Sequence, residues 1–210
     1  MAAQLDDDPA KNPRYAKLPA KEFRKIVTKS NASRDIYGFT TILSLTRQIS
    51  KRPAMKLISE YLLRKADGNI EDKLMPKFKS LMSPNSPFNV GVMLSERVLG
   101  LSLEVIPLLY NQLPEDLEFT KKQDDIKDPT EFNFDYYIIM SRYQIKASSS
   151  TRLYFKAEDE VFSAKQEFSF SFKSVRKDEE RGEGGITHYK EVIVMANKYF
   201  YQCLPMLENL

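Results

Sequence analysis

Few side chains in this sequence have the chemistry of a catalytic or metal centre. It contains one histidine, His188, and one cysteine, Cys203. A cysteine nucleophile needs a histidine base and an orienting group beside it, and a structural zinc site needs four such ligands. Two lone residues indicate neither arrangement. We interpret His188, beside a predicted strand, and Cys203, on the apolar face of a predicted helix, as structural residues, and we assign no catalytic or metal-binding residues.

The glycines do not form a phosphate-binding loop. Neither Gly-x-x-x-x-Gly-Lys-Ser/Thr nor Gly-x-Gly-x-x-Gly occurs. The nearest candidate is RGEGGI at 181–186, which partly resembles the Gln/Arg-x-x-Gly-x-Gly/Ala signature of acetyl-coenzyme-A-dependent acetyltransferases, but Ile186 replaces the required small residue. It also precedes a predicted strand, whereas the amides at a helix start bind phosphate. We therefore interpret 177–185 as a surface hairpin and expect no cofactor, no small-molecule substrate and no enzymatic activity.

Carboxylates are concentrated in the connection between Pro114 and Asn133. From Pro114 to Asp135 there are eight acids against three lysines, and the acids are Glu115, Asp116, Glu118, Asp124, Asp125, Asp128, Glu131 and Asp135. Acids on a loop do not define a general acid and base, because their separation is not known from sequence. The stretch shows no periodicity, so we expect a long loop that is either solvated or binds a basic surface.

Two patterns could indicate nucleic-acid binding. The alternation FSFSF (168–172) could form a stacking platform, but it has no basic neighbours and no RNP-type sequence, so we predict a strand with its phenylalanines in the core. The N-terminal region contains spaced basic residues that could form a nucleic-acid arm or nuclear-import signal. These residues are Lys11, Arg14, Lys17, Lys21, Arg24, Lys25 and Lys29.

From length, charge and hydropathy we expect one domain in an intracellular protein. The chain has 210 residues and a net charge of +3, with 17 Lys/Arg against 9 Asp/Glu in residues 1–82 and 15 against 20 in residues 83–210. Such asymmetry can steer a charged partner, although two solvated faces would also produce it. No apolar run approaches the roughly 18 residues of a membrane span, and MAAQLDDDPAKNP lacks a signal peptide's apolar segment. A single cysteine suits a reducing compartment.

Periodicity predicts strands and helices in an α/β (α+β) arrangement, as a mixed sheet flanked by helices. The predicted strands are Ile36–Leu45, Val90–Leu94, Phe134–Ile145, 168–174 and 188–195, of which the last two form an antiparallel pair. The predicted helices are Lys21–Thr28, Ala54–Ala66, Glu71–Met82, a helix with Leu103, Ile106, Leu109, Tyr110 and Leu113 on one face, Tyr154–Ala164, and Asn197–Leu207 with Asn197 as its N-cap. Leu57, Ile58, Tyr61 and Leu62 are the predicted buried stripe of the second helix. Residues 1–34 are a predicted tail with a short helix, and 35–210 a single domain.

Five stretches in order resemble the BCCIP family of eukaryotic nuclear proteins. The segment VGVMLSERVLGLSLEVIPLLYNQL (90–113) is similar to the family's strand with a Ser-Glu-Arg end, followed by a proline-containing helix that ends in Tyr-x-Gln-Leu. The other similar stretches are DIYGFTTILSLT (35–46), Tyr61-Leu62-Leu63, FDYYIIMSRYQ (134–144) and YFKAEDEVFSAKQEFSFSF (154–172). The resemblance covers nearly the whole chain from Asp35.

The resemblance implies a single domain with a mostly antiparallel central sheet and helices on both faces, similar to the GNAT acetyltransferase fold but without known catalytic activity. It also implies an adaptor. Fungal members resemble dedicated chaperones and nuclear-export partners of a basic large-subunit ribosomal protein, the universal protein L-fourteen, and animal members add genome-maintenance partners. We therefore expect a nuclear, shuttling monomer that binds a ribosomal protein and contacts the export machinery.

The acidic connection is the candidate site for this client, whose basic surface would otherwise bind RNA non-specifically. Ser95-Glu96-Arg97, predicted as a charged exit from the strand at 90–94, either touches a partner or fixes the strand-to-helix turn. The candidate partner-binding residues are Glu115, Asp116, Glu118, Asp124, Asp125, Asp128, Glu96 and Arg97. The alternatives are a divergent GNAT-type acetyltransferase and an RNA-binding module formed by the basic N-terminal half.

Overall fold

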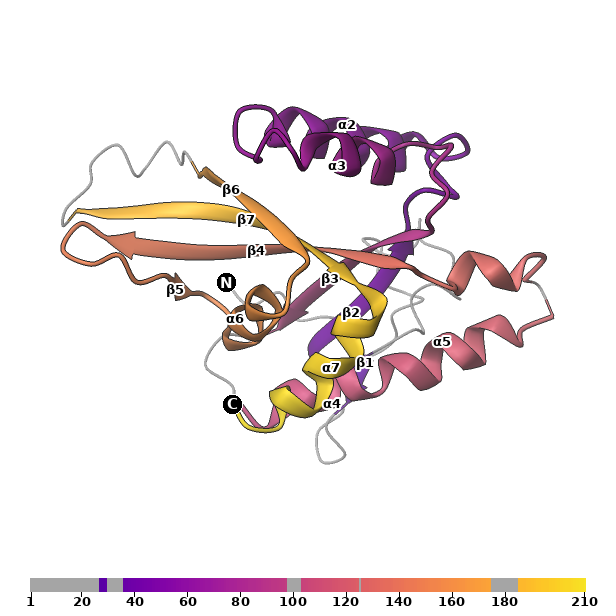
Figure 1. The fold of residues 1–210 in the computed structure, drawn as a ribbon. Helices are drawn as coiled ribbons and strands as arrows, with labels where there is room; N and C mark the ends of the chain where they lie inside the picture. The colour runs from indigo at the N-terminus through magenta and orange to yellow at the C-terminus, as the bar shows by residue number, and fades with distance from the viewer. Residues whose placement is uncertain (1–26, 30–35, 98–102, 125, 175–184) are drawn as a thin grey trace.

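A computed structural model describes residues 27–29, 36–97, 103–124, 126–174 and 185–210, and these form one sheet with helices packed on it (Figure 1). The strands are β1 (Val27–Lys29), β2 (Ile36–Ser44), β3 (Val90–Arg97), β4 (Tyr136–Lys146), β5 (Leu153–Tyr154), β6 (Phe168–Lys173) and β7 (Ile186–Ala196). Their order is β1-β2-β3-β4-β7-β6, with β5 paired beside β4. The β3 and β4 strands are parallel and the other neighbours antiparallel, which confirms the predicted mixed, mostly antiparallel sheet.

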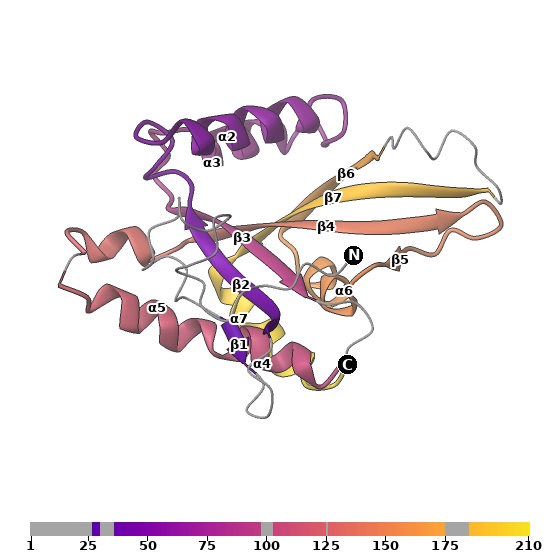
Figure 2. The same cartoon turned by 180° about the vertical axis from the view of Figure 1, so that it is seen from behind.

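The helices form two groups (Figure 2). The two groups pack against alternate residues of the strands. The elements are α2 (Pro53–Ala66), α3 (Met75–Leu81), α4 (Val105–Asn111), α5 (Leu113–Lys121), the 3-10 helix η1 (Pro129–Phe132), α6 (Ala157–Ala164) and α7 (Asn197–Leu207). Ile138 and Val194 pack with α2 and α3, whereas their chain neighbours Tyr137 and Met195 pack with α4, α6 and α7. Successive strand residues point to opposite faces, so each face of the sheet carries one hydrophobic cluster.

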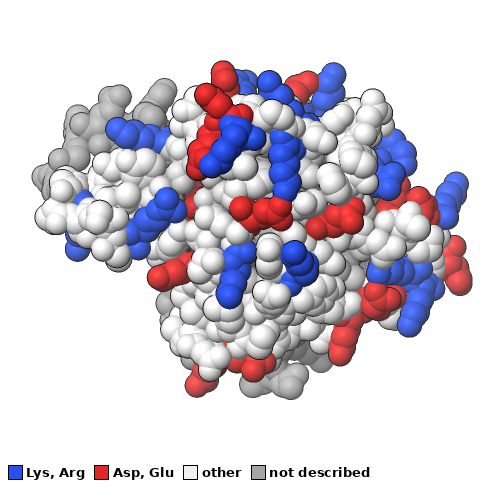
Figure 3. Space-filling view, in the orientation of Figure 1, with Lys and Arg blue, Asp and Glu red and all other residues white. Residues whose placement is uncertain are grey.

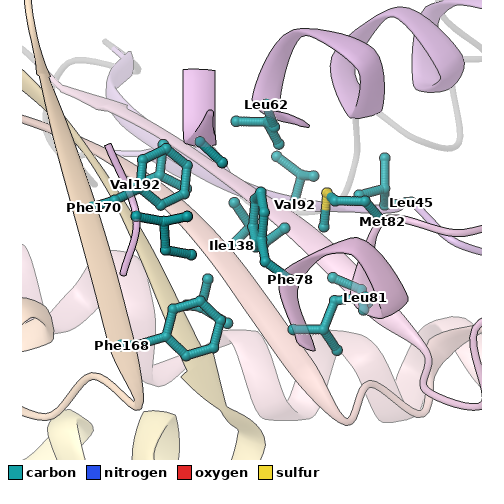
Figure 4. Packing of buried hydrophobic residues seen from close by; sticks show 14 of the residues in the cluster. Leu45, Leu62, Phe78, Leu81, Met82, Val92, Ile138, Phe168, Phe170 and Val192 are labelled. Atoms are coloured by element: carbon teal, nitrogen blue, oxygen red, sulfur yellow. The ribbon is translucent and has the colours of Figure 1, made fainter. Parts of the chain in front are cut away.

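Phe78 of α3 is the central contact of the hydrophobic cluster between the sheet and helices α2 and α3 (Figure 4). Its ring is fully buried and meets Phe170 and Phe168 edge-on, at centroid distances of 5.2 and 6.3 Å. Both phenylalanines come from the FSFSF strand, whose three rings are buried as predicted. Removing an aromatic ring from such a site costs about 3–5 kcal/mol. The phenylalanines that alternate along this strand therefore attach α2 and α3 to the sheet.

Several sequence expectations need correction. The predicted exit Ser95-Glu96-Arg97 is the end of strand β3, because these residues pair with Thr40, Phe39 and Gly38 of β2. Val27 and Thr28, expected at a helix end, pair with β2 as strand β1, and the rest of that predicted helix lies outside the described residues.

Two helices also differ in detail from the expectation. Leu57 is 65% exposed, because α2 packs through Met55, Ser59, Leu62 and Ala66. Asn197 is the first residue of α7 rather than its N-cap, because Ala196 has extended backbone geometry at the cap position. None of the described helices is long and apolar enough to span a membrane.

The expected loop between Pro114 and Asn133 is largely ordered. Residues 113–121 form helix α5, which has Pro114 in its first turn followed by Glu115 and Asp116. Proline is accepted at a helix start, and carboxylates there complement the helix dipole. After α5, residues 129–132 form η1, and Asp128 accepts a hydrogen bond from the Thr130 amide at 3.0 Å. Glu115, Asp116 and Glu118 are therefore held on α5, and Asp128 and Glu131 at the cap and within η1, rather than on a free loop.

Candidate functional site

A buried network of charged and polar side chains lies where the parallel strands separate. The β3 and β4 strands pair only from Val90 to Met93 and from Tyr136 to Ile139, and α6 begins beside the divergence. Two adjacent acids on α6 reach the two strands. Glu158 accepts hydrogen bonds from the Arg97 guanidinium of β3, and Asp159 accepts one from Ser141 of β4 at 2.9 Å. The start of α6 thus connects both sides of the divergence.

Three further hydrogen bonds converge on Ser95 of β3. Lys156 Nζ donates to its carbonyl at 2.9 Å, while the hydroxyls of Tyr110 and Thr40 donate to its Oγ at 2.8 and 3.1 Å. Burial raises the pKa of Tyr110 well above its ordinary value, so this phenol stays protonated and acts as a donor. These bonds fix α4 and the segment before α6 to the same strand.

A third buried carboxylate, Glu191 of β7, lies on the same face of the sheet as Ser141, which is its partner across the β4–β7 pair. It accepts hydrogen bonds from Arg152 at 2.8 Å and from Tyr154 and Ser169 at 2.9 Å each. Burial of two or more carboxylates is costly unless each is paired and hydrogen-bonded. Each of these acids has a cation within 3.8 Å and accepts at least one hydrogen bond, although Oδ1 of Asp159 has no hydrogen-bond partner, so we interpret the network as structural.

The network is poorly suited to an anionic cofactor. The first turn of α6 contains three carboxylates, Glu158, Asp159 and Glu160, at the helix end that would otherwise attract a phosphate. Burial raises the pKa of Asp159 to about 6, although Lys156 and Ser141 oppose that shift, so this group is largely ionised at neutral pH. Among the described residues no three His, Cys, Asp or Glu side chains gather as metal ligands.

The outer surface of α4 and α5 combines exposed apolar side chains with acids. Leu108 is 60% exposed and Phe119 is 67% exposed, which are high values for large apolar residues. Carboxylates separate them at helical spacing. We call the exposed side chains of Glu104, Leu108, Glu115, Glu118 and Phe119 the acidic helical face. Residues 103–124 contain five carboxylates and two lysines, and one of those, Lys121, pairs with Glu118.

The C-terminal helix extends this surface. The Asn111 amide of α4 donates to Glu208 just beyond α7 at 3.1 Å, which places the ends of the two helices side by side. Tyr201, Met206 and Leu210 are all more than a third exposed. Figure 3 shows a largely uncharged area over the lower part of the molecule, with acidic side chains below and beside it and lysine or arginine side chains above it. An apolar surface with an acidic border is suited to a partner that is apolar and basic.

The structure separates the predicted site residues into different environments. Glu115 and Glu118 are exposed on α5, and Asp124 is exposed just after it. Asp116 is half-buried, which raises the pKa of its carboxyl, and Asp128 is held by Thr130. Of the remaining acids, Glu131 accepts a hydrogen bond from Lys51, and Asp135 accepts one from the backbone amide of Asn89. Asp125 lies outside the described residues.

Glu96 and Arg97 lie on opposite faces of β3. The Glu96 side chain is exposed, whereas the Arg97 side chain is only 5% exposed and lies in the buried pair with Glu158. Arg97 is therefore a structural residue that joins β3 to α6. The position of Glu96 leaves it available to a partner.

Sequence reasoning missed Leu108 and Phe119. The apolar stripe predicted for this region contains Ile106, Leu109, Tyr110 and Leu113, which are indeed buried, whereas Leu103 is exposed. Leu108 and Phe119 lie off that stripe, on the face occupied by the acids. An apolar residue on the polar side of an amphipathic helix is the signal that could have identified this surface.

Comparisons with known proteins agree on one family. A family model described as BCCIP matches residues 19–179. Protein bcp1 of Schizosaccharomyces pombe is 24% identical over 202 residues, which cover 82% of this chain and 68% of that protein. Protein bcp1 of Aspergillus fumigatus is 31% identical over 148 residues, covering 61% and 47% of the two chains. The BCCIP homolog of Drosophila melanogaster is 21% identical over 185 residues, covering 83% and 60%.

A solved structure shows the same fold. The crystal structure of BCP1 from Saccharomyces cerevisiae matches with a TM-score of 0.56 and 21% sequence identity, over 87% of this chain and 67% of that one. The chain therefore spans between about half and two thirds of the length of these proteins. At this identity the structural match establishes the fold alone.

Proposed function

Because the chain belongs to the BCCIP family, we propose that it is a non-enzymatic adaptor that binds and shields a basic ribosomal protein of the large subunit. The relatives named bcp1 and BCCIP support a non-enzymatic role. The proposed client is the universal protein L-fourteen, as the family resemblance implies. The chain would act in ribosome biogenesis as a monomer that shuttles between nucleus and cytoplasm with this client and the nuclear export machinery.

The observation that carries this proposal is the exposure of Leu108 and Phe119 between carboxylates on the acidic helical face. A ribosomal protein presents arginine and lysine to rRNA, together with apolar patches that are covered only in the ribosome. Carboxylates at helical spacing would pair with the cations, and the two apolar side chains would cover the patches. The client would then be unavailable to RNA, which otherwise binds it through phosphate contacts.

The helical framework suits this task. Leu109, Tyr110 and Leu113 anchor α4 and the start of α5 in the core, so the opposite side of these helices is presented on a rigid support. A pre-formed surface binds with a smaller loss of conformational entropy than a loop that must become ordered. The long loop expected from sequence would have bound less favourably for the same charges.

The test is a binding assay between this chain and purified L-fourteen protein at increasing salt. A triple variant, Glu115→Gln/Glu118→Gln/Asp124→Asn, removes three exposed charges from α5 and the residues after it. The matched control, Glu60→Gln/Glu71→Gln/Asp72→Asn, removes three exposed charges around α2 and α3. We expect the first variant to bind at least about tenfold more weakly and the control to bind like the unmodified chain. Equal affinities for all three would contradict the proposed site.

We also propose that the sheet has the GNAT acetyltransferase arrangement that the family resemblance implies, without the activity. The mostly antiparallel strand order supports the arrangement. The absence of activity is supported by the carboxylates in the first turn of α6 and by Ile186 in place of a small residue in the partial signature. A divergent acetyltransferase would have to bind its anionic cofactor despite both features.

A further inference from the structure

The β4 and β7 strands form a long arm beyond the body of the sheet. They pair without interruption from Tyr136 to Lys146 and from Ala196 back to Ile186, whereas β3 accompanies β4 only as far as Ile139 (Figure 1). The short strand β5 pairs with Tyr143 and Gln144 on the side of β4 that β3 has left. We call residues 140–156, 168–174 and 185–191 the arm.

The register places a defined set of side chains on one face of the arm. Leu153, Gln144 and His188 lie in one row across β5, β4 and β7. The next row on the same face in one direction pairs Arg142 with Lys190, and in the other direction it pairs Lys146 with Ile186. Side chains of paired residues point to the same side, and alternate rows share a face. This is the face that α2 and α3 cover farther along the sheet, since Ile138 and Val194 belong to it.

Large apolar side chains are exposed on this face. Leu153 is 42% exposed, Ile186 is 40% exposed, and Phe155, just after β5, is 41% exposed. Phe155 is held above the sheet by its amide, which donates to the Arg142 carbonyl at 3.0 Å, and by stacking on His188. The three residues come from two segments about 30 residues apart, so their meeting is a property of the fold and not of one local sequence.

The arm is strongly basic. Three cations lie on the face described above, namely Arg142, Lys146 and Lys190. Of the other cations in these ranges, Arg152 binds the buried Glu191 on the opposite face, Lys156 donates to the Ser95 carbonyl, and Lys173 pairs with Tyr189 in a row of the opposite face. Glu191 is the one acid in these ranges. The last turn of α2 adds Arg64 and Lys65, and Lys65 lies over the ring of Phe172, which is paired with Lys190. On the side of the arm that Figure 3 shows, lysine and arginine side chains lie among uncharged atoms.

We propose that this face of the arm binds an acidic segment of a partner protein that also carries apolar side chains. The exposed cations provide the charge complement, and Leu153, Phe155 and Ile186 provide contacts for apolar side chains. Single-stranded nucleic acid fits less well, because it needs free aromatic faces for stacking, and two of the three exposed apolar residues are aliphatic. The ring of Phe155 is already stacked on His188 and has the Arg142 guanidinium 5.7 Å from its centroid.

This site is separate from the acidic helical face. The arm face lies on the side of the sheet that α2 and α3 cover, whereas α4 and α5 pack on the other side. The chain can therefore bind a basic client and an acidic segment at the same time. The inference does not depend on the identity of the client.

The experiment measures fluorescence anisotropy of a labelled peptide made of alternating Asp/Glu and Leu/Phe, with the full chain as titrant. A second peptide with Asn/Gln in place of the acids tests the charge contribution, and labelled oligouridine tests the nucleic-acid reading. The variant Arg142→Glu/Lys146→Glu reverses two cations of the arm, and Leu153→Ser/Ile186→Ser removes two of the apolar contacts. Lys79→Glu/Lys127→Glu reverses two exposed cations elsewhere and is the charge-matched control.

We expect the acidic peptide to bind, both arm variants to weaken its binding at least about tenfold, and the control variant to change it little. Thermal unfolding of all variants should match that of the unmodified chain, since the altered side chains are exposed. Equal binding of the neutral peptide, unchanged binding by the arm variants, or tighter binding of oligouridine than of the acidic peptide would each overturn the proposal.

Discussion

Arg97 of β3 and Glu158 of α6 form a two-bonded ion pair inside the protein. The guanidinium Nε and Nη2 atoms donate to the two carboxylate oxygens at 3.1 Å each, and the side chains are 5% and 0% exposed. The hydrogen bonds to Glu158 raise the pKa of Arg97, so the arginine is charged at every accessible pH. The pair joins residues 61 positions apart and holds α6 at the divergence of the parallel strands.

The first prediction concerns the loss of one member of this pair. Arg97→Met or Glu158→Gln leaves the other group buried without its partner, so each should lower the free energy of unfolding by about 3–5 kcal/mol in a urea titration. The double variant Arg97→Met/Glu158→Met leaves no buried charge and should lose less than the sum of the two single changes. Single changes that cost under about 1 kcal/mol would show that water reaches the pair.

The second prediction is a pH dependence that comes from Asp159. Its pKa in the folded protein is about 6, above the ordinary value of 3.8, chiefly because of burial. Folding therefore favours the protonated form, and the resulting stability is present below the unfolded pKa and is lost as pH rises through the folded pKa. Asp159→Asn cannot ionise. Its free energy of unfolding, relative to that of the unmodified chain, should rise by about 2–3 kcal/mol between pH 4 and pH 7.

The comparison in that experiment is a difference between two chains at each pH, so the other titrating groups cancel to first order. Asp128→Asn is a suitable control, because hydrogen bonds from Thr130 lower the pKa of Asp128 and its pH dependence has the opposite sign. A difference between unmodified chain and Asp159→Asn that stays constant from pH 4 to pH 7 would contradict the raised pKa.

The third prediction concerns the contact between β2, β3 and Phe134, which lies two residues before β4. A Cβ atom on Gly91 would lie 2.6 Å from Cγ2 of Ile42 and 3.0 Å from the ring of Phe134. Both neighbours are buried, so they can move little, and Gly91→Ala should cost about 1–3 kcal/mol in chemical unfolding. Gly68→Ala has no atom within 4 Å of its Cβ and should show only the backbone cost of its φ of 71°, about 1 kcal/mol. An equal loss for both variants would mean that the β-sheet contact is not tight.

Local sequence pattern predicts which segments are strands and helices better than it predicts which of their faces pack against the rest of the fold. Alternation at Phe168, Phe170 and Phe172 indicated a strand with one buried face, because burial on a strand follows a period of two. For α2 the helical period was recognised, but the buried stripe was wrong at Leu57. A leucine-rich helix has apolar side chains on more than one face. Which face becomes buried depends on the position of Phe78 and the sheet, and the local sequence does not contain that information.

The candidate site shows the same limit. Pro114 followed by Glu115 and Asp116 is a helix-start signal, but the run of acids that follows has no helical periodicity and therefore favours a loop. The pairing of Arg97 with Glu158 could not be predicted, because charge type alone does not select one partner among 29 acids. Exposure of Leu108 and Phe119 depends on which side of α4 and α5 faces the core, so the acidic helical face became recognisable only with the fold in place.

The fourth prediction tests the acetyltransferase alternative. Ligand that binds the native state raises the melting temperature in proportion to the logarithm of its concentration over the dissociation constant. We expect millimolar acetyl-coenzyme A to leave the melting temperature unchanged, because the acids of α6 oppose an anionic ligand at that helix end. Coenzyme A without the acetyl group is the control for non-specific effects. A rise with acetyl-coenzyme A, seen by differential scanning fluorimetry and growing with concentration, would favour the enzyme reading.

The fifth prediction separates apolar contact from charge on the acidic helical face. Leu108→Ser/Phe119→Ser should weaken binding of the L-fourteen protein by about 10- to 100-fold, because desolvated apolar anchors commonly dominate interface energy. Both side chains are exposed in the free chain, so its stability should change by no more than about 0.5 kcal/mol. Leu57→Ser is the matched control, since Leu57 is equally exposed at 65% but lies on α2, on the opposite side of the sheet.

The two kinds of variant also respond differently to salt. Loss of the apolar pair should lower affinity at every ionic strength, whereas loss of the three carboxylates should matter most at low salt, where charges are least screened. Affinity measured from low to high salt for both sets therefore assigns the contributions separately. If Leu57→Ser weakened binding as much as the change at Leu108 and Phe119, the client would be bound over the α2 side, and the acidic helical face would have to be abandoned as its site.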